Sequence, residues 1–423
     1  MDKSKVLFDY GPLDDTFIGH DIFNPVHLRY TVTLDHEVDD ELVKLAWDRT
    51  KRVYPVIDGV LATERDESEY MAPGGEKYHD EHVYLVEAEG GSNDPVKTKV
   101  PIMPRSDAVD GRLICISYWG NEISINTYHI LVDGGGLTMV FRTFLYCYLA
   151  LYTGHEDASP IVELREGREL GAYYGYNDIG FISTLDYTPT PLYVLPCGTV
   201  GFVDDDMVNE DGHVRTGSAK ISASDFMGLC KKSGSNPSSM ISTLLGKVAY
   251  ALNPSEQNDI VFGLTVSTRN VYGLENSIGN VLGLAVAYAT REEVEHAPLA
   301  QVAQKIRADI NRQRGRDYQI SLQRVFTMYE PVAKFKPLTV TYMGAFSVGE
   351  NDSHIRDFIM GTNGNTNLYL MQMGEHFYLT LQYGRATQRY LDEFVRVLGE
   401  LGIEASIGRP AQSMENDVPV PVV

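Results

Sequence analysis

Cysteine, tryptophan and basic residues are scarce in this chain of 423 residues. The few cysteines are far apart in the sequence, so we expect neither a disulfide framework nor a cysteine-based zinc site. Lys and Arg number 36 against 58 Asp and Glu, which gives a formal net charge of −22. So acidic a surface repels phosphate backbones and anionic lipids, which argues against nucleic-acid binding and membrane association. The four cysteines are Cys115, Cys147, Cys197 and Cys230.

Long hydrophobic runs are missing as well. The longest, residues 144–152 and 281–289, are far shorter than the roughly 20 residues that a transmembrane helix requires. The first apolar stretch is interrupted by Asp9, so we expect no signal peptide and a cytoplasmic protein with free thiols. The sequence does contain 43% apolar residues and 26 tyrosines, enough to build large cores, and its length suggests two or three domains.

Strand-like and helix-like patterns alternate along the chain, which is typical of an α/β protein. Strands are predicted at 27–35, 112–118, 122–129, 259–267, 282–290, 338–343, 366–373 and 376–383. Helices are predicted at 39–52, 136–152, 237–252, 297–313 and 387–402. The periodicity weakens between 155 and 215, so we predict domains at 1–180 and 181–423 with a crossover near 180–200. The Pro-rich, acidic tail after Arg409 is expected to be mobile.

One segment, residues 128–136, carries chemistry. In it, His129 ends a predicted strand, Asp133 follows after three residues, and three glycines lead into a helix. Histidine exchanges protons near neutral pH, and the aspartate would orient the imidazole or hold the loop by pairing with an arginine. We expect Gly134 to Gly136 to supply unusual backbone angles. A structural histidine followed by an ordinary turn fits the same residues, but the strand before and the helix after favour function.

This His-x-x-x-Asp-Gly motif resembles that of the CoA-dependent acyltransferase superfamily. The group includes chloramphenicol acetyltransferase, the condensation domains of nonribosomal peptide synthetases, plant acyltransferases and free-standing alcohol acyltransferases. Residues 53–61, 263–283 and 339–344 resemble other segments of the family in the right order. Tyr128 and Asp58 replace a histidine and an arginine of condensation domains, and the plant motif Asp-Phe-Gly-Trp-Gly is missing. These departures favour a free-standing acyltransferase.

The resemblance implies two chloramphenicol acetyltransferase-like α/β domains with mixed sheets, arranged as a V with an active-site tunnel between them. It implies that His129 is the general base, and that Asp133 and Gly134 have structural roles, with an ion pair between Asp133 and Arg269. Groups that would hold the oxyanion or line the tunnel are Gly135, Ser267, Thr268 and Asn280. Simple pairing within a strand also fits Ser267 and Thr268, and a turn after Gly279 also fits Asn280.

The implied reaction moves an acyl group to a hydroxyl or amine of a small-molecule acceptor, as in secondary metabolism. The donor would be acyl-CoA or a phosphopantetheine thioester on an acyl or peptidyl carrier protein. No metal and no permanently bound cofactor are expected, since the residues 79–82 (His-Asp-Glu-His) fit a solvated strand edge or turn. Basic residues between 305 and 316 would receive phosphates or form a solvated helix face. Two alternatives stay open: a relative that binds a carrier or small molecule without acylation, and a derived reaction such as cyclisation.

Overall fold

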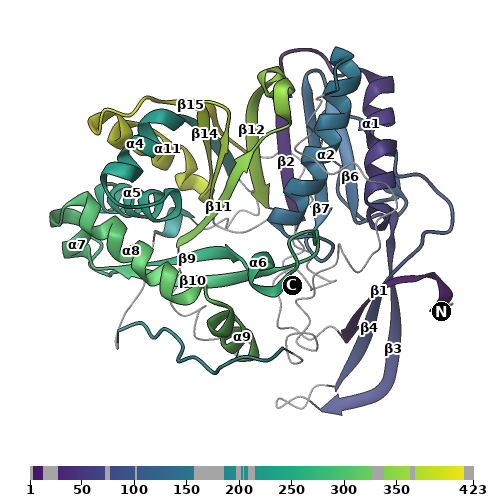
Figure 1. The fold of residues 1–423 in the computed structure, drawn as a ribbon, viewed down its shortest axis with the longest axis horizontal. Coiled ribbons are helices and arrows are strands. Elements are labelled where there is room, and N and C mark those ends of the chain that lie inside the picture. Colours follow the sequence, from purple (N-terminus) through teal and green to yellow (C-terminus); the bar gives the residue numbers. More distant parts are fainter. Residues whose placement is uncertain are drawn as a thin grey trace. The chain divides into compact units, whose positions relative to one another are not determined.

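A computed structural model of the chain describes residues 3–12, 27–71, 77–100, 102–156, 185–196, 202, 204–207, 215–325, 338–362 and 367–413. The chain divides into two units (Figure 1). Unit 1 contains Met1–Asp178 together with two short segments from later in the chain, Asn276–Asn280 and Val348–Arg356. Unit 2 contains the rest. Among the described residues, no helix combines the length and apolar character needed to cross a membrane.

Unit 1 is built on a five-stranded sheet of order β12-β2-β7-β6-β5, with a separate three-stranded sheet of order β1-β4-β3. Helices α1 and α2 pack against each other beside the larger sheet (Figure 1). Short 3-10 turns occur at Lys3–Lys5, Pro55–Asp58, Asp107–Val109 and, in η6, at Gly349–His354. The elements are β1 (Val6–Pro12), β2 (His27–Leu34), α1 (Asp40–Val53), β3 (Val60–Met71), β4 (Lys77–Val86), β5 (Val96–Lys97), β6 (Ile114–Trp119), β7 (Glu122–Tyr128) and α2 (Gly134–Thr153), followed by the start of β12 (Ile355–Thr362).

Strand alternation explains how unit 1 forms its core. On β2, residues such as Tyr30 and Val32 are buried, and the Tyr30 ring lies 6.4 Å from the Phe141 ring of α2. Alternate residues point to the opposite face of the sheet. Helix α1 begins where Asp39 caps it, since this carboxylate accepts the N–H groups of Glu41 and Leu42 at 2.9 and 3.0 Å. The predicted strands and helices of this region are confirmed to within two residues at either end.

Unit 2 is built on a seven-stranded mixed sheet of order β10-β9-β11-β13-β14-β8-β15. Pairs β11–β13 and β11–β9 are parallel, whereas the other described pairs are antiparallel. Helices α4, α5, α8 and α11 gather on one side of this sheet (Figure 1), over a continuous apolar core. The elements are β8 (Arg215–Ser222), α4 (Ala223–Lys232), α5 (Pro237–Leu252), β9 (Ile260–Ser267), α6 (Arg269–Tyr272), β10 (Leu282–Ala289), α7 (Arg291–His296), α8 (Leu299–Gln313), α9 (Arg316–Val325), β11 (Leu338–Phe346), β13 (Asn367–Met373), β14 (His376–Gln382), α11 (Thr387–Glu400) and β15 (Ala405–Ser413), with the remainder of β12 and short turns at Asp205–Met207 and Gly384–Ala386.

One expectation needs correction in unit 2. The tail expected to be mobile after Arg409 belongs to strand β15 as far as Ser413 and pairs with β8, where Gln412 lies opposite Thr216. The helix predicted from 297 is confirmed to within two residues, because α8 begins at Leu299, after the separate helix α7. Part of the predicted crossover lies outside the described residues, and the described stretch 185–196 forms neither helix nor strand. Cys197 and the residues after Ser413 also lie outside the described residues.

Candidate active site

His129 lies at the carboxyl end of the middle strand of the unit 1 sheet. Strand β7, between β2 and β6, ends at Tyr128, and helix α2 begins only six residues later at Gly134. The chain turns at once, because the Leu131 N–H donates to the Tyr128 carbonyl at 3.0 Å. The side chain of His129 is buried, with 9% of the residue exposed. A regular strand, a turn and a helix therefore fix the position of the imidazole.

The loop after His129 is held by its own polar groups. The Asp133 carboxylate caps α2 by accepting the Gly136 N–H at 2.7 Å, an interaction worth about 0.5–2 kcal/mol. The Gly134 carbonyl accepts the Tyr30 hydroxyl at 2.9 Å and the Thr138 hydroxyl at 2.8 Å. In the structure the Asp133 carboxylate thus caps α2 and two hydroxyls hold the Gly134 carbonyl, while the structural roles predicted for the two residues stay predictions.

The reason for the glycines differs from our expectation. None of Gly134, Gly135 and Gly136 has a positive φ, since all three begin helix α2. What Gly136 permits instead is a close approach: a Cβ there would lie 1.8 Å from the Ile278 carbonyl oxygen. The lack of a side chain lets the first turn of α2 touch the segment Asn276–Asn280, which belongs to the same unit.

That segment carries Asn280, which holds the backbone of the histidine. The Asn280 amide nitrogen donates to the His129 carbonyl at 2.7 Å and to the Ile130 carbonyl at 3.0 Å. Asn280 itself is buried, with 7% exposed. Its side chain therefore fixes the turn on which the imidazole stands.

The surroundings of His129 favour its neutral form. Burial lowers the pKa of His129 below its usual value, and its own backbone, the Asp133 carboxylate and the Asn280 amide offset this only in part. A neutral imidazole can accept a proton, so the arrangement suits a general base.

Comparisons with known proteins identify the fold. No protein-family model and no curated protein matches the sequence. Among solved structures, polyketide synthase associated protein 5 from Mycobacterium tuberculosis is 13% identical with a TM-score of 0.65, covering 93% of this chain and 97% of that one. TRI101 from F. sporotrichioides, complexed with coenzyme A and T-2, is 10% identical with a TM-score of 0.56, covering 92% and 97%. The first condensation domain of the CDA synthetase is 13% identical with a TM-score of 0.54, covering 92% of each chain.

The chain has the fold of the CoA-dependent acyltransferases and condensation domains. The resemblance seen in the sequence is thereby confirmed for the fold, which spans nearly the whole of each matched chain.

Three other residues that the sequence analysis assigned to the site, Ser267, Thr268 and Arg269, lie in unit 2. Arg269 is buried at the start of α6, with 7% exposed. The Thr268 hydroxyl donates to the Val281 carbonyl at 2.9 Å, and Ser267 is exposed at the end of β9. The ion pair between Asp133 and Arg269 stays a prediction, as does the V arrangement with its tunnel.

A stripe of polar side chains on β2 and β7 leads up to His129, and the sequence reasoning missed it. Arg29 donates through Nε to the Asn126 amide oxygen at 2.6 Å. Two residue pairs further, His27 lies opposite Tyr128, with ring centroids 5.8 Å apart. The signal was present, because polar residues alternate with apolar ones in the sequence of β2.

The end of this stripe next to His129 is electropositive. The Arg105 guanidinium lies 5.6 Å from the centroid of the Tyr128 ring, and its backbone has a left-handed φ of 64°. The pKa of His27 is lowered to about 4, mainly by burial and further by the positive charges of Arg29 and Arg105. His27 is therefore neutral at physiological pH.

The described cysteines are not activated as nucleophiles, and the described metal-ligand cluster lies elsewhere than at His129. Burial raises the pKa of Cys115 to about 12 and those of Cys147 and Cys230 to about 11, so these thiols stay protonated. In the part of the chain that the structure describes, the one group with metal-ligand geometry is formed by Asp35, His36 and His354, away from the His129 turn. Residues 79–82 lie in β4, but their side chains are outside the described set.

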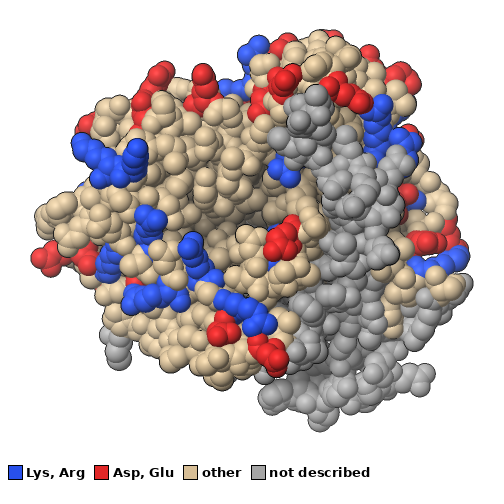
Figure 2. All heavy atoms as spheres, in the orientation of Figure 1, with Lys and Arg blue, Asp and Glu red and all other residues tan. Residues whose placement is uncertain are grey.

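Figure 2 shows Lys and Arg side chains gathered on the face of unit 2 that carries α8 and α9. Several of these charges are matched within the unit. Lys305 pairs with Glu293 at 2.6 Å, and Arg312 pairs with Asp309. Arg307 donates to the Gly234 carbonyl at 2.8 Å. On this face, Lys305, Arg307 and Arg312 therefore take part in local ion pairs and hydrogen bonds.

Proposed function

We propose that this protein is an acyltransferase that moves an acyl group from a CoA or carrier-protein thioester to a hydroxyl or amine of a small molecule. The observation that carries the proposal is the buried, neutral His129, whose backbone Asn280 fixes at the end of the middle strand. The shared fold supports it, because TRI101, one of the matched structures, is complexed with coenzyme A.

In the proposed reaction His129 removes the proton of the acceptor's hydroxyl or amine. The acceptor oxygen or nitrogen attacks the thioester carbonyl carbon and forms a tetrahedral intermediate. When the carbon–sulfur bond breaks, the thiolate leaves and takes the proton back from the imidazolium. The base is thus regenerated in each cycle, and an already activated thioester needs no further cofactor.

The oxyanion of the intermediate requires hydrogen-bond donors. The first N–H groups of a helix have no partner within the helix, and in α2 the Asp133 carboxylate takes that of Gly136. We therefore assign the Gly135 N–H, in the half-buried first turn of α2, as an oxyanion donor. The Thr268 hydroxyl already donates to the Val281 carbonyl, so it is a weaker candidate than the Gly135 N–H.

The test is product formation followed by mass spectrometry, with panels of acyl-CoA donors and of alcohol and amine acceptors. We expect an acylated product from the wild-type protein and none from His129→Ala. His296→Ala is the matched control, because that side chain is 75% exposed at the end of α7 and should not affect turnover. A product with the same mass as the acceptor would mean that no acyl group was transferred. Activity in His129→Ala equal to that of the wild type would mean that His129 is not the base. Either result would reject the proposal.

A further inference from the structure

A second cluster of ionisable groups lies in unit 1 where strand β2 ends. Asp35 and His36 directly follow β2, and His354 is the last residue of the turn η6. The two segments are joined by their backbones, since the Asp35 N–H donates to the His354 carbonyl at 3.0 Å. Residues 319 positions apart in the sequence thus meet at one point.

The side chains of this cluster converge on the carboxylate. His36 Nδ1 lies 2.6 Å from Asp35 Oδ1, and His354 Nδ1 lies 3.2 Å from each Asp35 oxygen. One donor atom from each of the three residues lies within 4.8 Å of the other two. Zinc–ligand bonds of about 2.0–2.1 Å place neighbouring ligands of a tetrahedral site about 3.4 Å apart. The His354–Asp35 distance is already close to this value, whereas the His36–Asp35 hydrogen bond would have to open. The two imidazoles would have to settle at the same spacing from within the 4.8 Å that encloses the ligand atoms.

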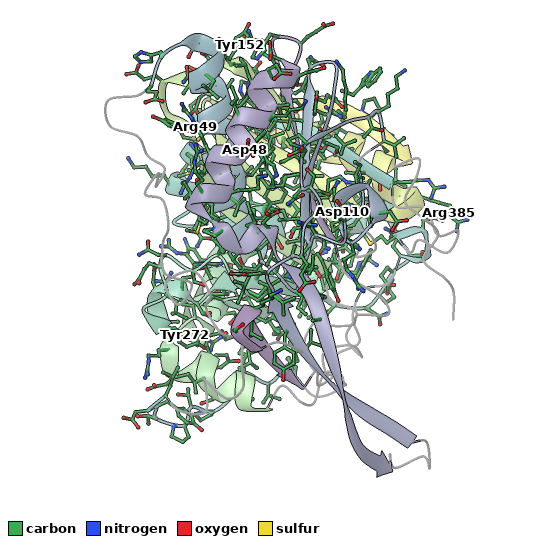
Figure 3. All side chains as sticks on the ribbon, turned by 90° about the vertical axis from the view of Figure 1, so that its right-hand side faces the viewer. Asp48, Arg49, Asp110, Tyr152, Tyr272 and Arg385 are labelled. Atoms are coloured by element: carbon green, nitrogen blue, oxygen red, sulfur yellow. The ribbon has the colours of Figure 1, made fainter. Side chains whose placement is uncertain are left out.

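The orientation of His36 is fixed by groups outside the cluster. Its ring stacks on that of Tyr152, with centroids 3.5 Å apart and an interplanar angle of 4°. Tyr152 lies near the end of α2 (Figure 3). His36 Nε2 lies 3.3 Å from the Tyr148 hydroxyl, which also accepts the Asp39 N–H at 3.2 Å. When Nε2–H donates to this hydroxyl, Nδ1 presents its lone pair to the cluster. A metal-binding histidine uses its second nitrogen in this way.

We propose that Asp35, His36 and His354 bind one divalent cation of the zinc class, through one carboxylate oxygen and two Nδ1 atoms. A water molecule would complete a tetrahedral site. Two imidazoles favour zinc or nickel over magnesium, which prefers oxygen ligands. The ion would fasten the 348–356 segment to the end of β2, and this role does not depend on the acyltransferase activity.

The positive charge of Arg356 competes with a cation for the Asp35 carboxylate, and this competition provides a test of the proposal. Arg356 Nη2 lies 3.4 Å from Asp35 Oδ2, but its side chain is 64% exposed and can turn into solvent. If the cluster is only a network of hydrogen bonds and ion pairs, removing Arg356 weakens it. If it is a metal site, removing this competing charge strengthens zinc binding.

The experiment is calorimetric titration of the full chain with Zn²⁺ after chelator treatment, and with Mg²⁺ in parallel. We expect one Zn²⁺ per chain, no Mg²⁺ binding and a higher melting temperature with Zn²⁺. His36→Ala and His354→Ala should weaken binding by about 100-fold, and Tyr148→Phe by about 10-fold, as for other outer-shell groups. Arg356→Ala should bind Zn²⁺ more tightly than the wild type.

The control is His155→Ala, which removes a nearby exposed histidine that pairs with Glu350 at 2.8 Å. It should leave the affinity unchanged. If His36→Ala fails to fold, His354→Gln and Tyr148→Phe provide the same comparison. The proposal is overturned if Zn²⁺ does not bind, if binding survives the histidine substitutions unchanged, or if Arg356→Ala weakens it.

Discussion

Removing the Asn280 amide should disturb both the stability of the protein and the aim of its histidine. In Asn280→Ala, the buried carbonyls of His129 and Ile130 lose their donor. Each unsatisfied buried carbonyl costs about 1–3 kcal/mol, so losing the donor to both should lower the free energy of unfolding by about 2–6 kcal/mol. Urea unfolding followed by circular dichroism measures this loss.

The catalytic effect of Asn280→Ala should appear in kcat more than in KM. The amide holds the turn that carries the imidazole, and a misplacement of about 1 Å can lower a rate on the order of 100-fold. The amide also raises the pKa of His129. In Asn280→Ala the acidic limb of the profile of kcat/KM against pH should therefore shift to lower pH.

Asn280→Asp is the matched isosteric variant. Its carboxylate would place oxygen acceptors next to the two carbonyl oxygens, where no hydrogen bond can form. The substitution should therefore be at least as destabilising as alanine. Its negative charge, however, favours the imidazolium and should move the acidic limb to higher pH. Shifts in opposite directions would be hard to explain by general loosening of the fold. Full stability and full kcat in both variants would refute the positioning role.

Three further outcomes follow from the same contacts. Gly136→Ala should destabilise by about 3 kcal/mol or more in urea unfolding, because its Cβ would meet the Ile278 carbonyl, whereas Gly228→Ala on α4, with nothing within 4 Å, should be neutral or slightly stabilising. Asp133→Asn keeps an equally good helix cap, so a loss of activity and of about 3 kcal/mol of stability would reflect the predicted ion pair of its charge, and unchanged values would exclude it. His27 has a pKa of about 4 in the folded chain against 6.5 ordinarily, so stability should fall by about 3 kcal/mol as the pH drops from 6.5 to 4, and His27→Gln should flatten this dependence in unfolding measurements at several pH values.

Local pattern was sufficient to predict the elements that carry the motif. The alternation in β7 and the apolar spacing in α2 are properties of neighbouring residues, so the strand, the turn and the helix around His129 could be read directly from them. The long hairpin of β3 and β4 was not predicted, because its charged residues hide the alternation that marks a strand.

The glycines show where a local interpretation gave the wrong cause. Glycine in a helix costs about 1 kcal/mol relative to alanine, so glycines at the start of α2 require a compensating reason. We looked for that reason in backbone angles, yet none of the three glycines has a positive φ and all lie in helix α2. For Gly136 the reason is the Ile278 carbonyl, which is supplied by a segment far along the chain.

The same separation explains why the role of Asn280 was missed. The contact between Asn280 and His129 joins residues 151 positions apart, and periodicity carries no information over such a distance. Within unit 1 the 276–280 segment supplies both the carbonyl that requires Gly136 and the amide that holds His129. Any change that displaces this segment should therefore affect the helix start and the histidine turn together. The site therefore depends on the 276–280 segment as much as on the His-x-x-x-Asp-Gly motif itself.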